Sequence, residues 1–341
     1  MDVTSQKKLL SVFTPVFNEE ENVRRCYEEV RRVCLSLGEK YDYEHVFADN
    51  CSEDRTLAIL REIAAGDPRV KVIAYSRNFG AEKSGFMGMR HVSGDVVTGI
   101  PADLQEPPSA IPLFLKKWEE GHEVVLGIYR NPYESVLRRS IRALYYRLID
   151  WLSPEPLPRD HSGFGLTDRV VIDEIIKVDD FNPYIRGLIA TIGFRQAKVP
   201  YERGTRMAGK SKHGLMFLLG FGMNGMIVHS LMPIRLATIS GVALAFLAIA
   251  LSIIYTFMKL FNWNIQARGA TTTIVLTLFF SGVQLMFLGL LGEYIGAIHS
   301  QVRRKPFVVV RERINVGTPK RVAREVATRR GSDSDDHEHR A

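Results

Sequence analysis

The sequence is poor in cysteine. It contains three, Cys26, Cys34 and Cys51, in 341 residues. An odd number cannot form a fully paired disulfide framework, so the count indicates a reducing compartment. Residues 1–8 are polar and contain no apolar run of the kind that directs secretion. We therefore expect the N-terminal region to stay in the cytosol.

Charge is missing from two long stretches toward the C-terminal end. The whole chain carries 45 Lys and Arg against 38 Asp and Glu, a formal charge of +7. Yet no charged side chain occurs in 236–258 or in 269–292. With 46% hydrophobic and 24% charged residues, the chain is too apolar to be disordered. The sequence thus separates a charged, soluble part from an apolar one.

The two charge-free runs predict a transmembrane hairpin over 236–292. As a helix, the 23 residues of the first run would span roughly 34 Å, which exceeds a hydrocarbon core of about 30 Å. Basic residues flank the pair on both sides, whereas the linker holds only Lys259 and Arg268. This distribution places both ends of the hairpin in the cytosol. Two buried core helices are the alternative, but soluble helices of this length usually have a polar face.

Three further segments surround the hairpin. Residues 206–235 combine a basic loop with an apolar, glycine-containing stretch from His213 to Met232. We interpret that stretch as a helix lying along the membrane surface, with a third span as the alternative. Residues 293–314 are predicted to return to the cytosolic domain and pack on it. Residues 315–341 have the composition of a disordered tail.

Residues 1–205 have the pattern of one α/β domain. Short apolar runs alternate with helical patterns: strands are predicted over 9–15, 43–48, 70–75 and 95–100, and helices over 22–37, 54–65 and 82–91. This alternation predicts a mainly parallel, Rossmann-like sheet with right-handed crossovers. Because ligands bind such sheets at the carboxyl ends of the strands, the loops 15–19, 49–52, 76–80 and 101–105 should converge on one cleft.

The last of these loops favours a metal and a diphosphate. No Gly-x-Gly-x-x-Gly follows the first strand, which argues against a dinucleotide. Asp103 and Gln105 are oxygen donors two residues apart, which suits a hard divalent cation carrying a diphosphate. Arg77 and Arg130 could add positive charge to the same phosphates. Each loop alone is more typical of a turn with polar caps. Four such loops in one series favour a site.

A phosphate-binding pattern, Gly-x-x-x-x-Gly-Lys-Ser, occupies 204–211. A P-loop lies between a strand and a helix, and needs more of the sheet downstream to supply an acidic metal ligand. Here the chain enters the apolar region instead. We interpret the segment as a basic loop near lipid headgroups, with a P-loop NTPase as the less favoured alternative.

The ordered set of motifs resembles family 2 glycosyltransferases. The motifs are Phe13-Thr-Pro-Val-Phe-Asn-Glu19, Ala48-Asp-Asn-Cys-Ser-Glu-Asp-Arg-Thr56, Ser76-Arg-Asn-Phe-Gly80, Ala102-Asp-Leu-Gln-Glu-Pro-Pro108, Gly163-Phe-Gly-Leu166, Gly209-Lys-Ser-Lys212 and Gly292-Glu-Tyr-Ile-Gly296. More narrowly they resemble polyprenyl-phosphate glycosyltransferases of the dolichol-phosphate mannose synthase and bactoprenol glucosyltransferase type. The likeness covers about 9–315. The Gln-x-x-Arg-Trp signature of processive polysaccharide synthases is not found.

The resemblance implies a GT-A fold and a membrane enzyme that works at the cytosolic face of the cytoplasmic or inner membrane. It implies inverting transfer of a hexose, glucose or mannose, from a UDP- or GDP-sugar to a polyprenyl phosphate such as undecaprenyl phosphate. It also implies Mg²⁺ or Mn²⁺, contact with membrane lipid, a homotetramer and no nucleic-acid partner. A membrane module that binds a nucleotide sugar with little or no catalysis is the rival interpretation.

Carried onto matching positions, the resemblance assigns roles to individual residues. For the nucleotide sugar they are Pro15, Phe17, Asn18, Glu19, Asp49, Asn50, Arg77, Asn78, Phe79 and Asp103; for the metal, Asp103 and Gln105; for the lipid phosphate, Lys210, Ser211 and Lys212. Catalytic roles fall to Asp103 and to Arg130 at the diphosphate. Asp160 as a fallback base, and Arg138, Arg139 and Arg206 at the lipid phosphate, are our own interpretation of nearby acidic and basic residues.

Two positions depart from the family pattern. Pro101 stands where many members have a first Asp before Asp103, and Gly163 stands where many have the Asp proposed as base. The metal is therefore expected to have one protein ligand fewer. A lipid monophosphate, with a second pKa of about 6, is largely dianionic at neutral pH. It is already a nucleophile, so the missing base favours a phosphate acceptor.

Overall fold

The computed structural model describes residues 7–130, 161–178, 180, 183, 185–204, 232–260, 270–303 and 306–317. These residues divide into two compact units. One contains 7–130, 161–204 and 306–317 with the gaps just given, and the other contains the two long helices of 232–303. Each unit is described separately below.

The first unit is built on an eight-stranded sheet with the strand order β7-β5-β6-β4-β1-β2-β3-β8. Its N-terminal half comprises β1 (Lys8–Val16), α1 (Val23–Ser36), β2 (Tyr41–Asp49), α2 (Thr56–Gly66), β3 (Val70–Tyr75), α3 (Ala81–Met89) and β4 (Val96–Gly99). These four strands are mutually parallel. The predicted alternation of strands and helices is confirmed, and each element ends within two residues of its predicted bound.

The rest of the sheet contains antiparallel strands that the sequence pattern did not predict. The 3₁₀ turn η1 (Pro108–Ala110) and α4 (Ile111–Glu119) lead to β5 (Val124–Arg130), which is followed by β6 (His161–Asp168), α6 (Arg169–Ile175), α7 (Ile185–Thr191) and β7 (Gln196–Glu202). β6 runs antiparallel between β4 and β5. Its first residues therefore lie beyond the carboxyl end of β4, at the edge where the predicted loops meet.

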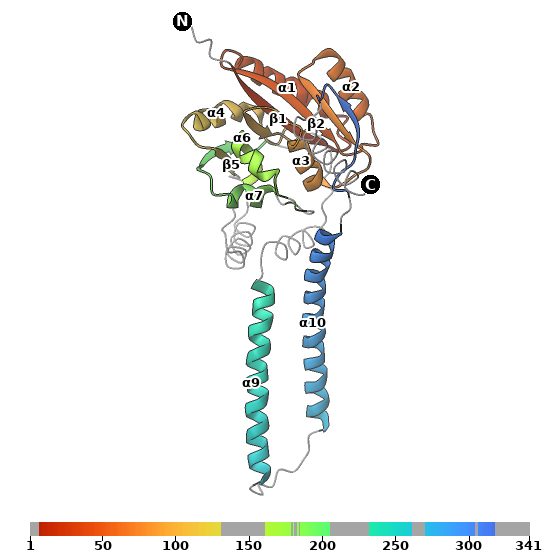
Figure 1. Cartoon of the computed structure of the whole chain (residues 1–341), viewed down its shortest axis with the longest axis vertical. Coiled ribbons are helices and arrows are strands. Elements are labelled where there is room, and N and C mark those ends of the chain that lie inside the picture. The colour runs from red at the N-terminus through yellow and green to blue at the C-terminus, as the bar shows by residue number, and fades with distance from the viewer. Residues whose placement is uncertain are drawn as a thin grey trace, which may run out of the picture. The chain divides into compact units, whose positions relative to one another are not determined.

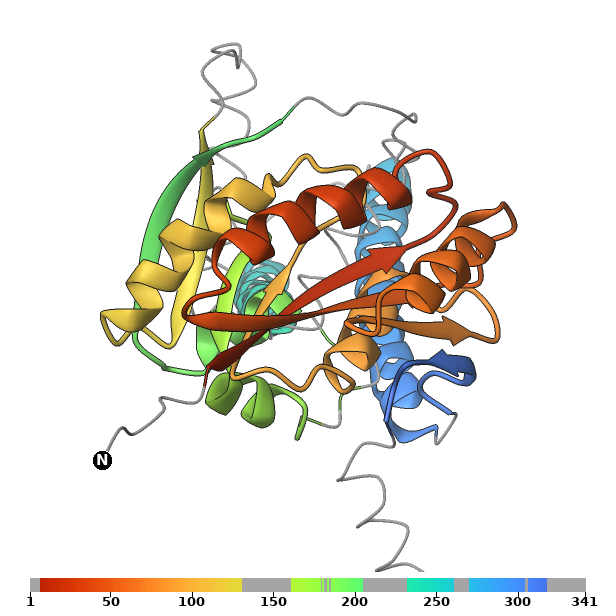
Figure 2. The same ribbon diagram turned by 90° about the horizontal axis from the view of Figure 1, so that it is seen from above.

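Helices cover both faces of the sheet. Leu10 and Val12 on β1 pack with α1 and α4 on one face, the face seen in Figure 2. Phe13, the residue after Val12, points to the other face and packs there with α3 and with α6 residues such as Ile172. This alternation follows from the twofold side-chain period of a strand. Because both faces are covered, nearly every residue of β1 and β2 is buried, including polar ones such as Ser11 and His45.

An antiparallel strand, β8 (Val310–Ile314), closes the sheet beside β3. Arg61 of α2 donates to both carboxylate oxygens of Glu312, at 3.1 and 2.6 Å. Asn315 donates from Nδ2 to the carbonyls of Ala64 and Val70, at 2.7 and 3.0 Å. These contacts join residues about 250 positions apart in the chain.

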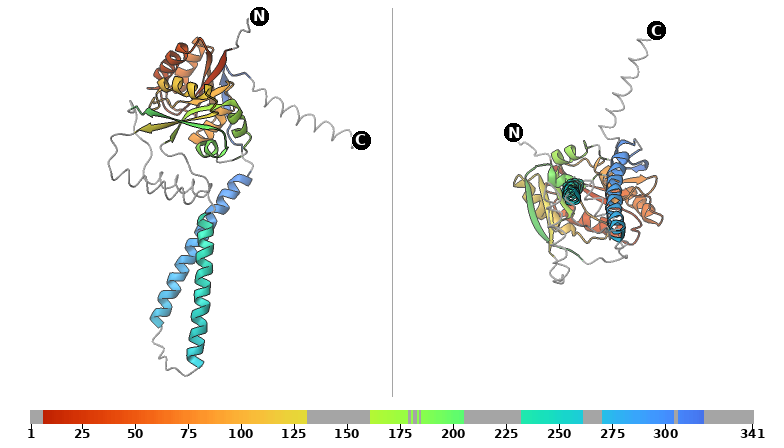
Figure 3. Two further views of the ribbon diagram at one scale, coloured as in Figure 1. Left: turned by 90° about the vertical axis from the view of Figure 1, so that its left-hand side faces the viewer. Right: turned by 90° about the horizontal axis from the view of Figure 1, so that it is seen from below.

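The second unit is a helical hairpin of α9 (Met232–Leu260) and α10 (Ala270–Val302), which run antiparallel (Figures 1 and 3). Ile234–Leu251 has a mean hydropathy of 2.1 and Phe279–Val302 one of 1.3. Both helices are long and apolar enough to cross a membrane, and they contain nearly all of the two predicted runs. The predicted surface helix lies outside the described residues except for Met232, as does the tail from 318 onward.

Candidate active site

The loop after β1 is tied to the loop after β2. Asn18 adopts a left-handed conformation, with φ of 55°. Its backbone N–H donates to Oγ of Ser52 at 2.9 Å, and its own Oδ1 accepts from the N–H of Glu53 at 2.8 Å. Glu19 is held in the same way, by donation of its N–H to Oγ1 of Thr56 at 2.9 Å. The two loops therefore form one rigid wall.

Asp49 ends β2 and is almost completely buried. Burial raises the pKa of its carboxyl, although hydrogen bonds from Ser52 act in the opposite direction. The backbone N–H of Ser52 lies 3.3 Å from both carboxylate oxygens. A buried acceptor of this kind suits recognition of a donor group such as a base imino N–H.

The loop after β3 joins the same wall. Asn50 donates to Oδ1 of Asn78 at 2.8 Å and accepts from the N–H of Phe79 at 2.9 Å. The Arg77 guanidinium stacks 4.1 Å from the centre of the Phe79 ring. Stacking holds this cation at the loop, where an anionic ligand would meet it.

The loop after β4 carries the predicted metal ligands. Oδ1 of Asp103 accepts from the N–H of Gln105 at 3.2 Å, and Leu104 between them has a left-handed φ of 54°. The Gln105 side-chain oxygen accepts from Nη2 of Arg203 at 3.0 Å. Gly204 donates its backbone N–H to the Gln105 carbonyl at 2.9 Å. The first amide of the Gly-x-x-x-x-Gly-Lys-Ser pattern is thus engaged by this loop.

Cys26 lies near carboxylates of both the first and the last loop. This thiol is fully buried in α1. Burial raises its pKa to about 12, and the negative charges of Asp103 and Glu19 both add to the increase. Both carboxylates therefore lie near Cys26, as the predicted convergence on one cleft requires.

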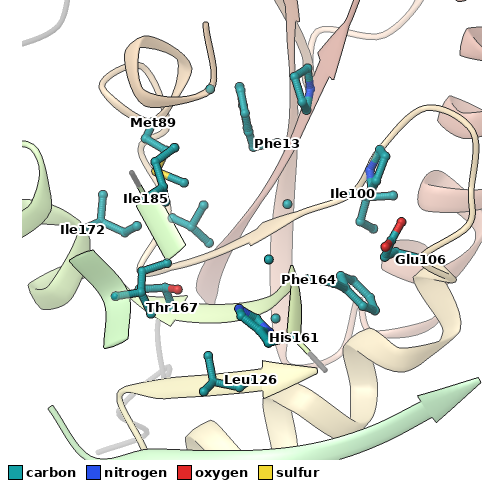
Figure 4. Close-up of a pocket in the computed structure, with 18 of the residues that line it drawn as sticks. Phe13, Met89, Ile100, Glu106, Leu126, His161, Phe164, Thr167, Ile172 and Ile185 are labelled. Atoms are coloured by element: carbon teal, nitrogen blue, oxygen red, sulfur yellow. The ribbon is translucent and has the colours of Figure 1, made fainter. Parts of the chain in front are cut away.

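A cavity of about 210 Å³ adjoins these loops. Its wall includes Pro15 and Pro101, the starts of two site loops, and Gly163 of β6. Most of its lining is apolar: Phe13, Ile100, Leu126, Phe164, Ile172 and Ile185 surround it (Figure 4). His161 also lines it, with Nδ1 placed 3.1 Å from the Gly127 carbonyl. Because a carbonyl only accepts, this nitrogen carries the proton.

The described structure brings most of the predicted nucleotide-sugar residues into one region. Asn18 and Glu19 are bound to the loop that follows Asp49, and Asn50 is bound to Asn78 and Phe79. Arg130 ends β5 at the same edge of the sheet, and its side chain lies outside the description. Also outside the described residues are Asp160, Arg138, Arg139, Arg206, Lys210, Ser211 and Lys212.

Sequence reasoning missed the pairing of Arg203 with Glu106. The carboxylate of Glu106 is buried and lies 3.5 Å from Nη2 of Arg203. Arg203 and Gln105 are 98 residues apart, so no local pattern relates them. The sequence contains one hint of this pair: Glu106 directly follows the predicted ligand Gln105, and Arg203 directly precedes the glycine-rich pattern.

The oxygen atoms of Asp103 and Gln105 fit Mg²⁺ or Mn²⁺, which prefer carboxylate and carbonyl ligands. Among the described residues no group of three or more His, Cys, Asp or Glu could hold a metal ion. A cation on the oxygens of Asp103 and Gln105 would be completed by a diphosphate and water, which is usual for Mg²⁺ in phosphate-transfer sites.

Comparison with known proteins agrees with this arrangement. The model of glycosyl transferase family 2 matches residues 11–176. The uncharacterized glycosyltransferase YkcC of Bacillus subtilis is 36% identical over 303 residues, covering 89% of this chain and 93% of that protein. The chain belongs to glycosyl transferase family 2. It is a glycosyltransferase that uses a nucleotide sugar, and its first unit has the GT-A fold.

Other relatives of this family 2 enzyme carry more specific names. The bactoprenol glucosyl transferase of Shigella phage SfII is 33% identical over 307 residues, which cover 89% of this chain and 97% of that protein. Among solved structures, the mannosyltransferase PcManGT of Pyrobaculum calidifontis, in complex with GDP-Man and Mn²⁺, matches with a TM-score of 0.47 at 14% identity. That match covers 88% of this chain and 89% of the other.

Proposed function

We propose that this enzyme transfers a hexose, glucose or mannose, from UDP or GDP to a polyprenyl phosphate such as undecaprenyl phosphate. The observation that carries the proposal is how much of the chain matches a named relative. The likeness to a bactoprenol glucosyl transferase extends over 89% of the chain and 97% of that protein, so it is too long to be confined to the first unit and takes in the apolar helices as well. A lipid acceptor explains why a nucleotide-sugar site and two candidate membrane spans occur in one chain.

The donor would lie across the loops described above. Asp49 and the loop that Asn18 and Asn50 hold together would receive the nucleoside. Asp103 and Gln105, with Arg130, would face the diphosphate. A divalent cation bound to Asp103 and Gln105 would supply positive charge that stabilises the departing nucleoside diphosphate.

The acceptor phosphate would attack without a protein base. Gly163 lies in the cavity wall with a φ of 96°, and it offers no carboxylate where many relatives have one. An ionised phosphate oxygen attacks the anomeric carbon from the face opposite the diphosphate. The bond from that carbon to the diphosphate oxygen breaks, and its electron pair leaves with the nucleotide. No proton has to be removed, so what the enzyme must supply is positioning and charge.

The lipid phosphate would be drawn to the site by Arg138, Arg139, Arg206, Lys210, Ser211 and Lys212. For an acceptor that still carries a proton, Asp160 is the fallback base. In this proposal α9 and α10 form a hairpin with both ends in the cytosol, and the enzyme acts as a homotetramer at the cytosolic face of the membrane. A basic segment beside a membrane span favours binding of anionic headgroups.

The test is a donor screen. Purified full-length enzyme in lipid nanodiscs would be incubated with undecaprenyl phosphate and each of several radiolabelled UDP- and GDP-sugars. We expect labelled lipid with one hexose donor, and its loss in Asp103→Ala but not in the matched surface variant Asp42→Ala. Labelled lipid with none of the donors, together with retained donor binding, would instead identify a binding module without catalysis.

A further inference from the structure

Arg203 fastens the end of β7 to the loop that carries the candidate metal ligands. Its Nη2 donates to the side-chain oxygen of Gln105 at 3.0 Å and lies 3.5 Å from the Glu106 carboxylate. The next residue, Gly204, donates its N–H to the Gln105 carbonyl at 2.9 Å. Two hydrogen bonds, one from a side chain and one from the backbone, thus end on Gln105.

The Gln105 oxygen that Arg203 holds is the atom with which this residue would bind a cation. A glutamine side chain has one oxygen acceptor, and its nitrogen only donates. Divalent cations take oxygen ligands at close to 2 Å. That oxygen has two lone pairs, but a guanidinium in hydrogen-bond contact with it would be repelled by a divalent ion bound to the same oxygen. Arg203 and the cation therefore disfavour each other at this one atom.

Glu106 gives the guanidinium a second partner. Its side chain is 4% exposed, whereas that of Arg203 is 40% exposed. The Arg203 ring contact, 5.6 Å to the centre of Tyr129, also lies outside the metal loop. Arg203 therefore keeps a charged partner and an aromatic neighbour when it releases Gln105, and release does not require the arginine to leave the site.

Pro101 increases the importance of the contact between Arg203 and Gln105, because it leaves the loop with fewer cation ligands. With proline in place of a first carboxylate, Asp103 and Gln105 are the two cation-binding side chains that the sequence offers in the loop 101–105. When Arg203 occupies Gln105, only the Asp103 carboxylate is left for the ion. Whether Arg203 is hydrogen-bonded to Gln105 thus decides if one of the two ligands in this loop is available to the cation.

We propose that Arg203 is a positioning residue that holds the Gln105 side chain in the cation-free enzyme and gives it up when Mg²⁺ or Mn²⁺ binds. Arg203 keeps the loop ordered before the donor arrives, and it weakens binding of the cation alone. The inference rests on the cation site of the proposed function. It adds that the cation must displace Arg203 from the Gln105 oxygen.

The test measures binding of Mn²⁺ alone to the full-length enzyme, by the electron paramagnetic resonance signal of free Mn²⁺. Arg203→Met removes the donors and keeps an unbranched stem. We expect Mn²⁺ to bind about threefold to tenfold more tightly, the equivalent of one hydrogen bond. Arg24→Met is the control, because Arg24 also pairs with a glutamate, Glu62 at 2.8 Å, but in that pair the glutamate is exposed as well.

A second background separates release of Gln105 from a simple loss of positive charge. In Gln105→Ala the cation has no contested ligand, so adding Arg203→Met should no longer tighten Mn²⁺ binding. Equal tightening in both backgrounds would overturn the inference, since Arg203 would then act only through its charge. Unchanged or weaker Mn²⁺ binding in Arg203→Met would overturn it as well.

Two further variants cover folding and the cation site. Arg203→Met with Glu106→Gln also removes the buried negative charge that faces Arg203, and it should show the same tightening. Asp103→Ala should weaken Mn²⁺ binding. If it does not, the cation site of the proposed function is wrong, and the inference falls with it. If it does and Arg203→Met has no effect, the inference alone is wrong.

Discussion

Asn50 donates from Nδ2 to Oδ1 of Asn78 over 2.8 Å, and this bond joins the loops that follow β2 and β3. The backbone fixes both amides. Asn50 accepts from the N–H of Phe79, and Asn78 accepts from the N–H of Gly80, each at 2.9 Å. Two side chains thus hold one wall of the donor site in a single arrangement.

Removing the Asn50 side chain should loosen that wall. Asn50→Ala deletes two hydrogen bonds at the loop, each worth about 1 kcal/mol. We expect the dissociation constant of the nucleotide sugar to rise about tenfold, as measured by isothermal titration calorimetry. Ser36→Ala is the control, since it deletes a bond to the Val33 carbonyl at the far end of α1. Equal donor affinity in Asn50→Ala and in the wild type would contradict the proposed place of the donor.

Restoring a carboxylate at position 101 should strengthen cation binding. Pro101→Asp adds a charged oxygen ligand at the start of the loop that holds Asp103 and Gln105, and affinity rises with the number of charged ligands. The expected gain in Mn²⁺ affinity is on the order of tenfold, the strength of a charge-assisted contact. Pro101→Ala separates this effect from a change in backbone freedom. If the two variants bind Mn²⁺ equally, position 101 does not face the cation.

The buried Glu44 should make the fold sensitive to acid. Burial raises the pKa of its carboxyl, but hydrogen bonds from Lys71, Ser11 and Ser93 outweigh burial and hold the pKa below the ordinary 4.5. The folded protein therefore binds this proton less well than the unfolded chain does. The resulting stability is present above pH 4.5 and is lost as the pH falls through the folded pKa.

Glu44→Gln tests this sign. At pH 7 we expect the free energy of unfolding to fall by about 1–3 kcal/mol, because charged hydrogen bonds are lost. The difference from the wild type should shrink as the pH falls below 4.5, as followed by urea denaturation at several pH values. Glu62→Gln removes an exposed glutamate of an ion pair and should show little change at either pH. A constant difference at all pH values would contradict the shifted pKa.

Two glycines beside the cavity should respond oppositely to a methyl group. A Cβ on Gly165 of β6 would lie 2.2 Å from the Val125 carbonyl oxygen, whereas one on Gly99 of β4 would have no atom within 4 Å. Gly165→Ala should lower the free energy of unfolding by about 1–3 kcal/mol. Gly99→Ala should be neutral, or stabilise by up to about 1 kcal/mol through reduced chain entropy. Thermal unfolding would compare the two variants. Equal destabilisation would mean that the close approach of β5 and β6 at Gly165 does not require a glycine.

The elements that the sequence predicts well are those with strong local patterns. β1 and α1, for example, differ from their predicted bounds by one residue, because apolar spacing and polar strand-end loops are local properties. β8 is different. Its pattern, Val-Arg-Glu-Arg-Ile, is short and half-exposed. Its place beside β3 depends on Arg61 and Ala64, which meet Glu312 and Asn315 across 251 positions.

From residue pattern alone one could establish the α/β class, the two charge-free helices and the loop residues that gather at the strand ends. These follow from periodicity and from the rule that parallel strands end at one edge. Only the folded chain revealed that β6 runs antiparallel beside the site, that Glu19 and Asp103 both lie near Cys26, and that Arg203 holds Gln105. Such contacts are made by side chains that are distant in sequence. They depend on packing and desolvation in three dimensions, which no local pattern encodes.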